Sequence, residues 1–281
     1  MGSESKTHFL LTGTWKDRLT CSEAIHLTQQ LVAQLDNAQL PFELVVCPPM
    51  IALASVASYI SHELSLGAQN LVWDDKSSFT GETRARALLE IGCKYVIVGH
   101  SERRLYLGET DTMVAQKITT SVNNGLIPII CIGEYLEEHQ QGHAERVIRE
   151  QLNTAITALQ GVREPSKFVL AYEPAWAIST SDMNNGMKCE PAEANRRHQT
   201  IRETLEKKWG AEFAKEVSII YGGSVDPQNA ADYFCQSDID GGLVGTASQR
   251  NDTFFELINI SRTILTKKAI YKDVNKHMQH R

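Results

Sequence analysis

Short apolar runs alternate with longer stretches of helical periodicity along almost the whole chain, and this alternation limits the available folds more than any other feature. Several runs are apolar at nearly every position, which is typical of parallel strands covered on both faces. We predict strands at residues 9–14, 42–47, 66–69, 95–99, 127–132, 168–172, 217–221 and 241–244. We predict helices at residues 22–35, 51–62, 83–91, 110–124, 144–159, 191–209, 227–234 and 253–265.

This order of elements suits either an open doubly wound sheet or a closed (β/α)8 barrel, because each unit has about the length of a βαβ step. Eight successive units, with no GxGxxG fingerprint after the first strand, favour the barrel. No linker or low-complexity run marks a second domain. We therefore predict a single-domain α/β protein with a (β/α)8 barrel over residues 1–265 and a basic C-terminal extension over residues 266–281.

The charge balance excludes some classes of partner. The chain has 28 Lys and Arg against 34 Asp and Glu, a net charge of −6. Residues 266–281 hold five basic residues and one acidic residue, a charge of +4, which leaves −10 for residues 1–265. A nucleic-acid-binding body needs a basic face, so we expect no nucleic-acid partner. An anionic substrate would have to be bound by a few placed cations and by backbone N–H groups.

Nothing in the sequence predicts a membrane or secreted protein. The N-terminus MGSESKTH is polar, and no apolar run approaches the roughly 18 residues that a membrane helix needs. The six cysteines show neither CxxC spacing nor a metal-binding cluster, which is typical of small buried residues in a reducing compartment. We expect a cytoplasmic protein with no membrane partner and no bound metal.

Polar residues follow the carboxyl ends of the predicted strands, where the active sites of (β/α)8 barrels lie. Lys16 follows the first strand, His100 the fourth and Glu173 the sixth. Glycine turns at residues 222–224 and 245–246 follow the last two strands, which together match a phosphate cradle, although either alone is more often a tight connection. Burial would raise the pKa of a carboxylate at position 173 towards the range useful for proton abstraction. This segregation predicts an enzyme.

Nine segments along the chain resemble those of a known enzyme family. They are CPPMIAL, GAQN, SSFTGET, YVIVGHSERR, LGETD, PIICIGE, AYEPAWAI, YGGSV and DIDGGLVGTAS, in order from Cys47 to Ser248, with a weaker TGTWK at residues 12–16. They resemble the signature segments of triosephosphate isomerases. The resemblance implies a TIM barrel without a cofactor that interconverts dihydroxyacetone phosphate and D-glyceraldehyde 3-phosphate in glycolysis and gluconeogenesis.

The resemblance also implies roles for single residues. Glu173 would move a proton between adjacent substrate carbons, and His100 would polarise the carbonyl as a neutral imidazole. Lys16 would hold the substrate and offset the charge of the enediolate, and Glu102 matches the family's second buried glutamate near the site. The residues expected to contact the substrate or its phosphate are Thr14, Lys16, Ser179, Ser224, Gly245 and Thr246.

Residues 177–190 resemble the mobile lid of the family, which follows a hinge at Pro174, Ala175 and Trp176. Closure of the lid would exclude water from the reacting groups. The residues assigned to the hinge and lid are Pro174, Trp176, Ala177, Ile178, Ser179 and Thr180.

The stretch 71–83 resembles the loop with which the family forms homodimers, docked beside the active site of the partner. Thr80 would lie at its tip, and Glu82 and Arg103 would pair across the interface. Ion pairs at the rim of an interface contribute little free energy. We expect a homodimer on the basis of this likeness.

Departures from the family pattern gather around the phosphate and the lid. Thr14 replaces an asparagine, Asp17 stands where a neutral residue is usual, and Ser179 replaces a glycine in a lid that is several residues longer. Thr246 replaces the second glycine of the last turn. If that position needs a positive φ, a β-branched residue there would be strained.

Three hypotheses about function follow. The first, which we favour, is a divergent triosephosphate isomerase. The second is a related isomerase for a larger ketose phosphate such as erythrulose phosphate, which a longer lid and an altered phosphate grip would suit. The third is a non-catalytic barrel, against which the four residues Lys16, His100, Glu102 and Glu173 argue. His139 and His143 lie four apart, and we expect both to be solvated surface residues rather than metal ligands.

Overall fold

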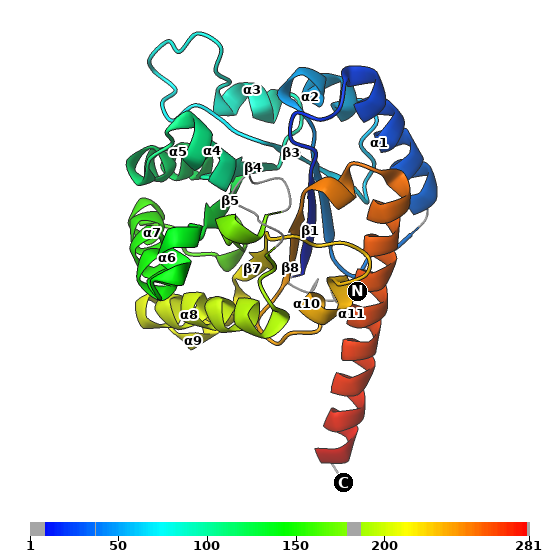
Figure 1. Cartoon of the computed structure of the whole chain (residues 1–281). Helices are drawn as coiled ribbons and strands as arrows, with labels where there is room; N and C mark the ends of the chain where they lie inside the picture. The colour runs from blue at the N-terminus through cyan, green and yellow to red at the C-terminus, as the bar shows by residue number, and fades with distance from the viewer. Residues whose placement is uncertain (1–8, 37, 179–186, 280–281) are drawn as a thin grey trace.

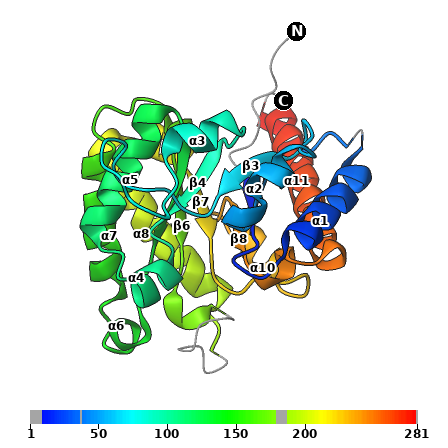
Figure 2. The same ribbon diagram turned by 90° about the horizontal axis from the view of Figure 1, so that it is seen from above.

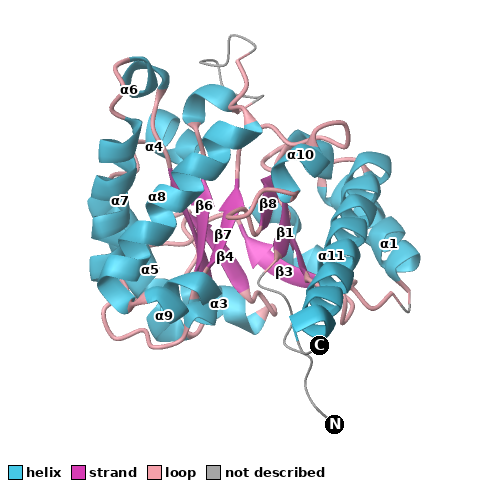
Figure 3. Cartoon of the chain, turned by 90° about the horizontal axis from the view of Figure 1, so that it is seen from below, coloured by secondary structure: helices cyan, strands magenta, loops and turns pink. Residues whose placement is uncertain are grey.

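Eight parallel strands close into a barrel in the computed structural model, which describes residues 9–36, 38–178 and 187–279, with side chains up to residue 270. Each strand pairs with the next in the chain, and β8 pairs back with β1. Helices surround the strands on all sides (Figures 1, 2 and 3). The predicted (β/α)8 barrel is confirmed.

The strands lie within one residue of their predicted ends, because strands buried on both faces stand out as apolar runs. They are β1 (Leu10–Thr14), β2 (Glu43–Cys47), β3 (Ser65–Ala68), β4 (Tyr95–Val98), β5 (Ile127–Ile132), β6 (Val169–Tyr172), β7 (Ser218–Tyr221) and β8 (Gly241–Val244). Alternate side chains point in opposite directions. Leu10, Val45 and Ile129 belong to a cluster that fills the barrel, whereas Leu11 and Val46 belong to the layer that packs against the helices.

The predicted helices are all present. They are α1 (Cys21–Leu35), α2 (Met50–Ala57), α3 (Ala85–Glu90), α5 (Asp111–Asn124), α7 (Ala144–Ala158), α8 (Pro191–Trp209), α10 (Ala230–Phe234) and α11 (Asn251–Gln279). The second is shorter than predicted, because hydrogen bonds of the turn type replace the helical ones beyond Ala57.

Six short helical elements in the described part of the chain were not predicted, because three to seven residues hold too little periodicity to detect. They are α4 (Ser101–Leu107), α6 (Leu136–Gln140) and α9 (Ala211–Glu216), with the 3₁₀ turns η1 (Pro165–Lys167), η2 (Ala175–Ala177) and η3 (Thr246–Ser248). Three of them, α4, η2 and η3, begin within three residues of the ends of β4, β6 and β8.

The last helix, α11, runs on without interruption through residue 265, where the sequence analysis placed the end of the helix and of the barrel domain. Residues 266–279 contain neither glycine nor proline, so nothing in this stretch breaks the helix. A helix of 29 residues is about 43 Å long, longer than the barrel strands, and Figure 1 shows its second half projecting beyond the body. No helix in the described residues has the length and apolarity needed to cross a membrane.

Candidate active site

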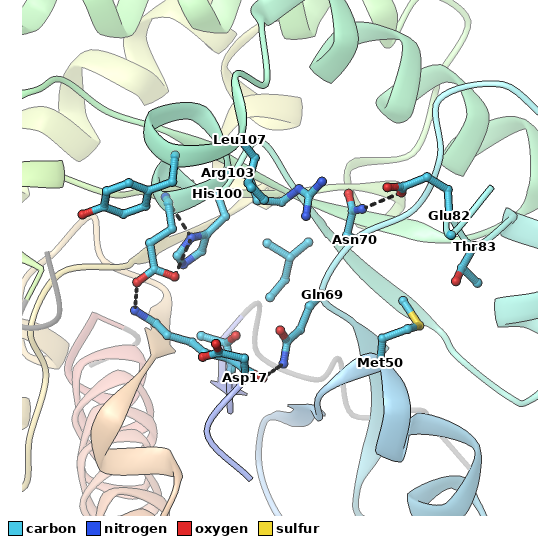
Figure 4. Close-up of a pocket in the computed structure, with 15 residues that line it drawn as sticks. Asp17, Met50, Gln69, Asn70, Glu82, Thr83, His100, Arg103 and Leu107 are labelled. Atoms are coloured by element: carbon cyan, nitrogen blue, oxygen red, sulfur yellow. Dashed lines mark hydrogen bonds and ion pairs between the residues drawn. The ribbon is translucent and has the colours of Figure 1, made fainter. Parts of the chain in front are cut away.

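A pocket of about 450 Å³ opens at the carboxyl ends of β1, β3 and β4. Figure 4 shows His100, Gln69 and Arg103 around this hollow, with Glu82 and Thr83 across from His100. Residues that the sequence analysis assigned to the substrate site also line it: Thr14, Lys16, His100 and Glu102. The pocket therefore brings together side chains that are 86 residues apart in the chain.

Lys16 is held in an uncommon backbone conformation. Its φ of +52° is the one positive φ among the described residues other than glycine, and such a conformation costs about 1 kcal/mol or more. The side-chain amide of Gln69 donates to the carbonyl oxygens of Lys16, at 2.7 Å, and Cys47, at 2.9 Å, which fixes the turn after β1. Lys16 Nζ then lies 2.5 Å from Glu102 Oε1, and the lysine is 9% exposed.

The imidazole of His100 is oriented by the helix that follows it. His100 caps the N-terminus of α4, and its Nδ1 accepts a hydrogen bond of 3.3 Å from the backbone N–H of Glu102. An accepting Nδ1 carries no proton, so in the neutral ring the proton lies on Nε2. Nε2 is 3.2 Å from Glu173 Oε1. The ring therefore presents a donor towards the carboxylate.

Glu173 is buried at the end of β6, with 2% of its surface exposed. Its Oε2 accepts a hydrogen bond of 3.1 Å from the backbone N–H of Ser101. Two glycines on the neighbouring strand ends allow their backbones to pass close to Glu173. A Cβ atom at Gly133 would lie 1.9 Å from the carbonyl oxygen of Glu173, and one at Gly222 would lie 2.6 Å from its Cγ. The carboxylate is thus held in a confined place, next to one ring nitrogen and one backbone donor.

The predicted phosphate turns adjoin this group of residues. A Cβ atom at Gly245 would lie 3.5 Å from Lys16 Cε, so the turn after β8 faces the lysine. Ser224 donates through its hydroxyl to the carbonyl oxygen of Ala177, at 2.7 Å. Thr246 is exposed and begins η3 without a positive φ, so the condition for backbone strain at this position is not met. Ser179 lies outside the described residues.

Comparison with known proteins agrees with this geometry. The family model described as triosephosphate isomerase matches residues 9–261. The triosephosphate isomerase of Chloroflexus aurantiacus is 42% identical over 251 residues, which cover 89% of this chain and 98% of the relative. That of Thermoanaerobacter pseudethanolicus is 41% identical over 253 residues, with the same coverage of both chains. The chain belongs to the triosephosphate isomerase family.

The hinge that the triosephosphate isomerase resemblance predicted is packed into a buried cluster. Pro174 precedes the turn η2, and Trp176, Ala177 and Ile178 are all buried, whereas Thr180 lies outside the described residues. Trp176 Nε1 donates to Glu134 Oε1 at 2.9 Å. Sequence reasoning missed this glutamate, although it ends the apolar segment PIICIGE at the carboxyl end of β5.

The expectation that His139 is a solvated surface residue was wrong. Its ring stacks on Trp176, with 3.9 Å between centroids and an angle of 27° between planes, and its side chain is 25% exposed. The contact joins α6 to η2, and sequence spacing does not reveal it. His143 precedes α7 and is exposed, as expected. In the described residues no three His, Cys, Asp or Glu side chains gather as metal ligands would.

A buried ion pair behind the pocket was also missed. Lys117 and Glu109 are each 1% exposed and lie 2.6 Å apart, and Gly99 donates its N–H to Glu109 Oε1 at 2.9 Å. Burial alone would raise the pKa of Glu109, but the charges of Lys117 and Arg103 lower it overall. For Lys117 burial has the larger influence and lowers the pKa. The pair fixes the turn after β4, which carries His100.

Two of the residues predicted to contact a second subunit, Arg103 and Glu82, have partners within the chain. Arg103 Nε lies 2.7 Å from Glu109 Oε2, and Glu82 Oε2 accepts from Asn70 Nδ2 at 3.2 Å. Thr80 and Glu82 are exposed in the stretch 71–83. A pairing between Glu82 and Arg103 across an interface stays a prediction.

Proposed function

We propose that this chain is a triosephosphate isomerase, which interconverts dihydroxyacetone phosphate and D-glyceraldehyde 3-phosphate. Membership of the family supports the reaction. One structural observation supports this reaction above all. The buried carboxylate of Glu173 lies 3.2 Å from Nε2 of His100, at the same end of the barrel as Lys16. A base, a hydrogen-bond donor and a cation around one site are the groups that proton transfer next to a carbonyl needs.

In this mechanism Glu173 takes a proton from the carbon beside the substrate carbonyl. The electron pair of the broken C–H bond forms the enediolate, and the same carboxyl group returns the proton to the neighbouring carbon. The base is 2% exposed, so little water surrounds it. A dry, preorganised base needs little solvent reorganisation when the proton moves.

His100 and Lys16 act on the oxygen atoms. Nε2 of His100 donates to the carbonyl oxygen and stabilises the negative charge that develops there. The backbone N–H of Glu102 at Nδ1 favours the tautomer that donates from Nε2. The ammonium group of Lys16 adds an opposite charge, and Glu102, 2.5 Å from it, holds that ammonium in place.

The phosphate would be bound largely by backbone N–H groups. Ser224, Gly245 and Thr246 follow β7 and β8, and Lys16 lies beside Gly245. An acidic body suits this arrangement, because oriented amides bind a phosphate without a basic face. The hinge and lid residues 174–180, including Ser179, and a contact of Thr14 with the substrate belong to the same proposal.

We also propose a cytoplasmic homodimer. Exposed apolar side chains line the pocket, where Leu107 is 65%, Tyr106 51% and Met50 40% exposed, and Glu82 lies at the same rim. A large exposed apolar patch at a pocket is typical of an interface. The six cysteines are free thiols in the structure, which is typical of a reducing compartment.

An assay of purified protein tests the reaction. The chain should isomerise dihydroxyacetone phosphate, and Glu173→Gln should lower kcat by at least about 10³-fold, because the amide cannot accept the proton. Erythrulose phosphate should be the poorer substrate. A preference for the tetrulose of more than about tenfold in kcat/KM, about 1.4 kcal/mol, would instead favour the second hypothesis. A rate unaffected by Glu173→Gln would exclude the mechanism, and no rate on either sugar would leave a non-catalytic barrel.

A further inference from the structure

The second half of α11 lies outside the part of the chain shared with the family. The family model matches up to residue 261, whereas the helix continues to Gln279. The relative from Chloroflexus aurantiacus aligns over 98% of its own length but only 89% of this chain. The barrel and its site therefore do not need this helical extension.

A groove of about 580 Å³ runs between α10 and α11, on the outer surface of the barrel. Ile260 and Ile264 form much of its floor, and Ala231 and the exposed Cys235 form the wall on the side of α10. The groove continues to Lys267, past the last residue that matches the family model. An apolar groove on a solvent-facing helix is typical of a docking site.

The charges at the two ends of the groove are opposite. Glu256 is exposed at one end and Lys267 is exposed at the other, with the two isoleucines between them. Eleven residues separate the two charges, about 16 Å along the helix. The whole helix follows the same pattern, because residues 251–261 carry two acidic and no basic residues, whereas residues 262–279 carry a net charge of +4.

We propose that this groove binds the same groove of a second copy of the chain, with the two α11 helices antiparallel. A two-fold axis near residue 262 would place Glu256 opposite Lys267 of the partner subunit, and the reverse contact would form at the other end. Such an interface must be complementary to itself, and a groove that is acidic at one end, basic at the other and apolar between them meets that condition. Parallel pairing would oppose like charges and is disfavoured.

This interface lies on a different part of the barrel from the proposed dimer contact at residues 71–83. It involves α10 and α11, whereas the pocket and its rim are formed by residues 14–107. Two kinds of two-fold contact in one assembly produce a closed tetramer when their axes cross at right angles. If the contact at residues 71–83 did not form, the α11 contact alone would still produce a dimer. The α11 pairing can therefore be tested independently of the dimer proposed through residues 71–83.

A charge swap tests the pairing. In sedimentation velocity at low salt, Glu256→Lys and Lys267→Glu should each halve the mass of the wild-type assembly, because each places like charges together. The double variant Glu256→Lys/Lys267→Glu should restore the full mass. Arg262→Glu, which changes the charge equally on the opposite side of the helix, is the matched control and should leave the mass unchanged. Circular dichroism should confirm that each variant is folded.

The same mass for the wild type, both single variants and the double variant would overturn the proposal. Failure of the double variant to recover the mass would also contradict antiparallel pairing and would favour another acidic partner. Removal of residues 266–281 should halve the mass while kcat/KM with dihydroxyacetone phosphate stays within about twofold. A truncated chain that keeps the wild-type mass would show that the extension has no part in assembly.

A second measurement follows the groove itself. Cys235 is exposed in the single chain, so its reaction with a maleimide should slow at least about fivefold when the protein concentration rises from the dissociated to the assembled range. The rate should stay constant over this range in Glu256→Lys. A wild-type rate that does not change with concentration would place the interface elsewhere.

Discussion

At the scale of single residues, the site depends on a few side chains held by neighbouring polar groups, of which only Glu102 was recognised as functional from the sequence. Gln69 fixes the backbone of Lys16, and Glu102 fixes both the ammonium of Lys16 and the tautomer of His100. Glu109 receives the N–H of Gly99, the residue before His100. The positions of the proposed catalytic groups therefore depend on buried polar contacts, and these contacts should also matter for stability.

The pair of Lys117 and Glu109 provides a direct test. Lys117→Met removes one partner and leaves a buried carboxylate without its main counter-charge, so we expect the free energy of unfolding to fall by about 3–5 kcal/mol. Lys94→Met is the matched control, because Lys94 lies 2.6 Å from Glu43 but is half exposed, and it should cost less than about 1 kcal/mol. Urea unfolding of both variants measures the difference, and equal losses would contradict the role of burial.

At the scale of elements, the sequence predicted those strands and helices that show an apolar run or a regular hydrophobic periodicity. The strands are right to within one residue because both of their faces are buried, and Pro191 marks the start of α8 correctly. Contacts between elements leave no periodic signal, which explains the wrong interpretation of His139 and the missed role of Glu134. The end of α11 was misplaced because amphipathicity ends near residue 265 while helix-forming residues continue.

One of these contacts between elements joins α10 to the chain that enters α8. The buried hydroxyl of Tyr233 donates to the carbonyl oxygen of Cys189 at 2.6 Å, and its ring stacks on Tyr221 with 4.4 Å between centroids. Tyr233→Phe keeps the stack and leaves the buried carbonyl without this donor, so we expect a loss of about 1–3 kcal/mol in the free energy of unfolding. Tyr59→Phe, at a half-exposed tyrosine, should change it by less than about 0.5 kcal/mol. Thermal or urea unfolding distinguishes the two, and equal effects would rule out a structural role for the hydrogen bond.

At the scale of the whole molecule, the acidic body does not prevent an anion site, because the proposed phosphate contacts are backbone amides and one lysine. The barrel, residues 1–265, carries a charge of −10, and its extension, residues 266–281, carries a charge of +4. Acidification removes negative charge from the barrel, and it also charges a histidine that the fold keeps neutral. The second effect sets a pH limit on stability that can be assigned to one residue.

That residue is His198, which is fully buried on α8 with its Nδ1 3.2 Å from the carbonyl oxygen of Asp238. Burial, helped by the charge of Arg202, lowers the pKa of His198 to about 3 in the folded protein. In the unfolded chain its pKa is about 6.5, so between these values the unfolded state binds one more proton than the folded state. Stability from this group is complete above pH ~6.5 and falls by up to about 1.4 kcal/mol per pH unit as the pH decreases towards ~3.

His198→Asn keeps a donor for the carbonyl of Asp238 but cannot be protonated in this range. The variant should be less stable than the wild type at pH 8, because the smaller side chain leaves a cavity. Between pH 6 and pH 4, however, the free energy of unfolding of the variant should fall less steeply than that of the wild type. The two slopes should differ by up to about 1.4 kcal/mol per pH unit, since the carboxylates titrate alike in both proteins and only the contribution of His198 is lost. Urea unfolding across this range measures the two slopes. Parallel curves would mean that His198 is protonated in the folded barrel, and a steeper curve for the variant would mean that protonation of His198 stabilises the folded state.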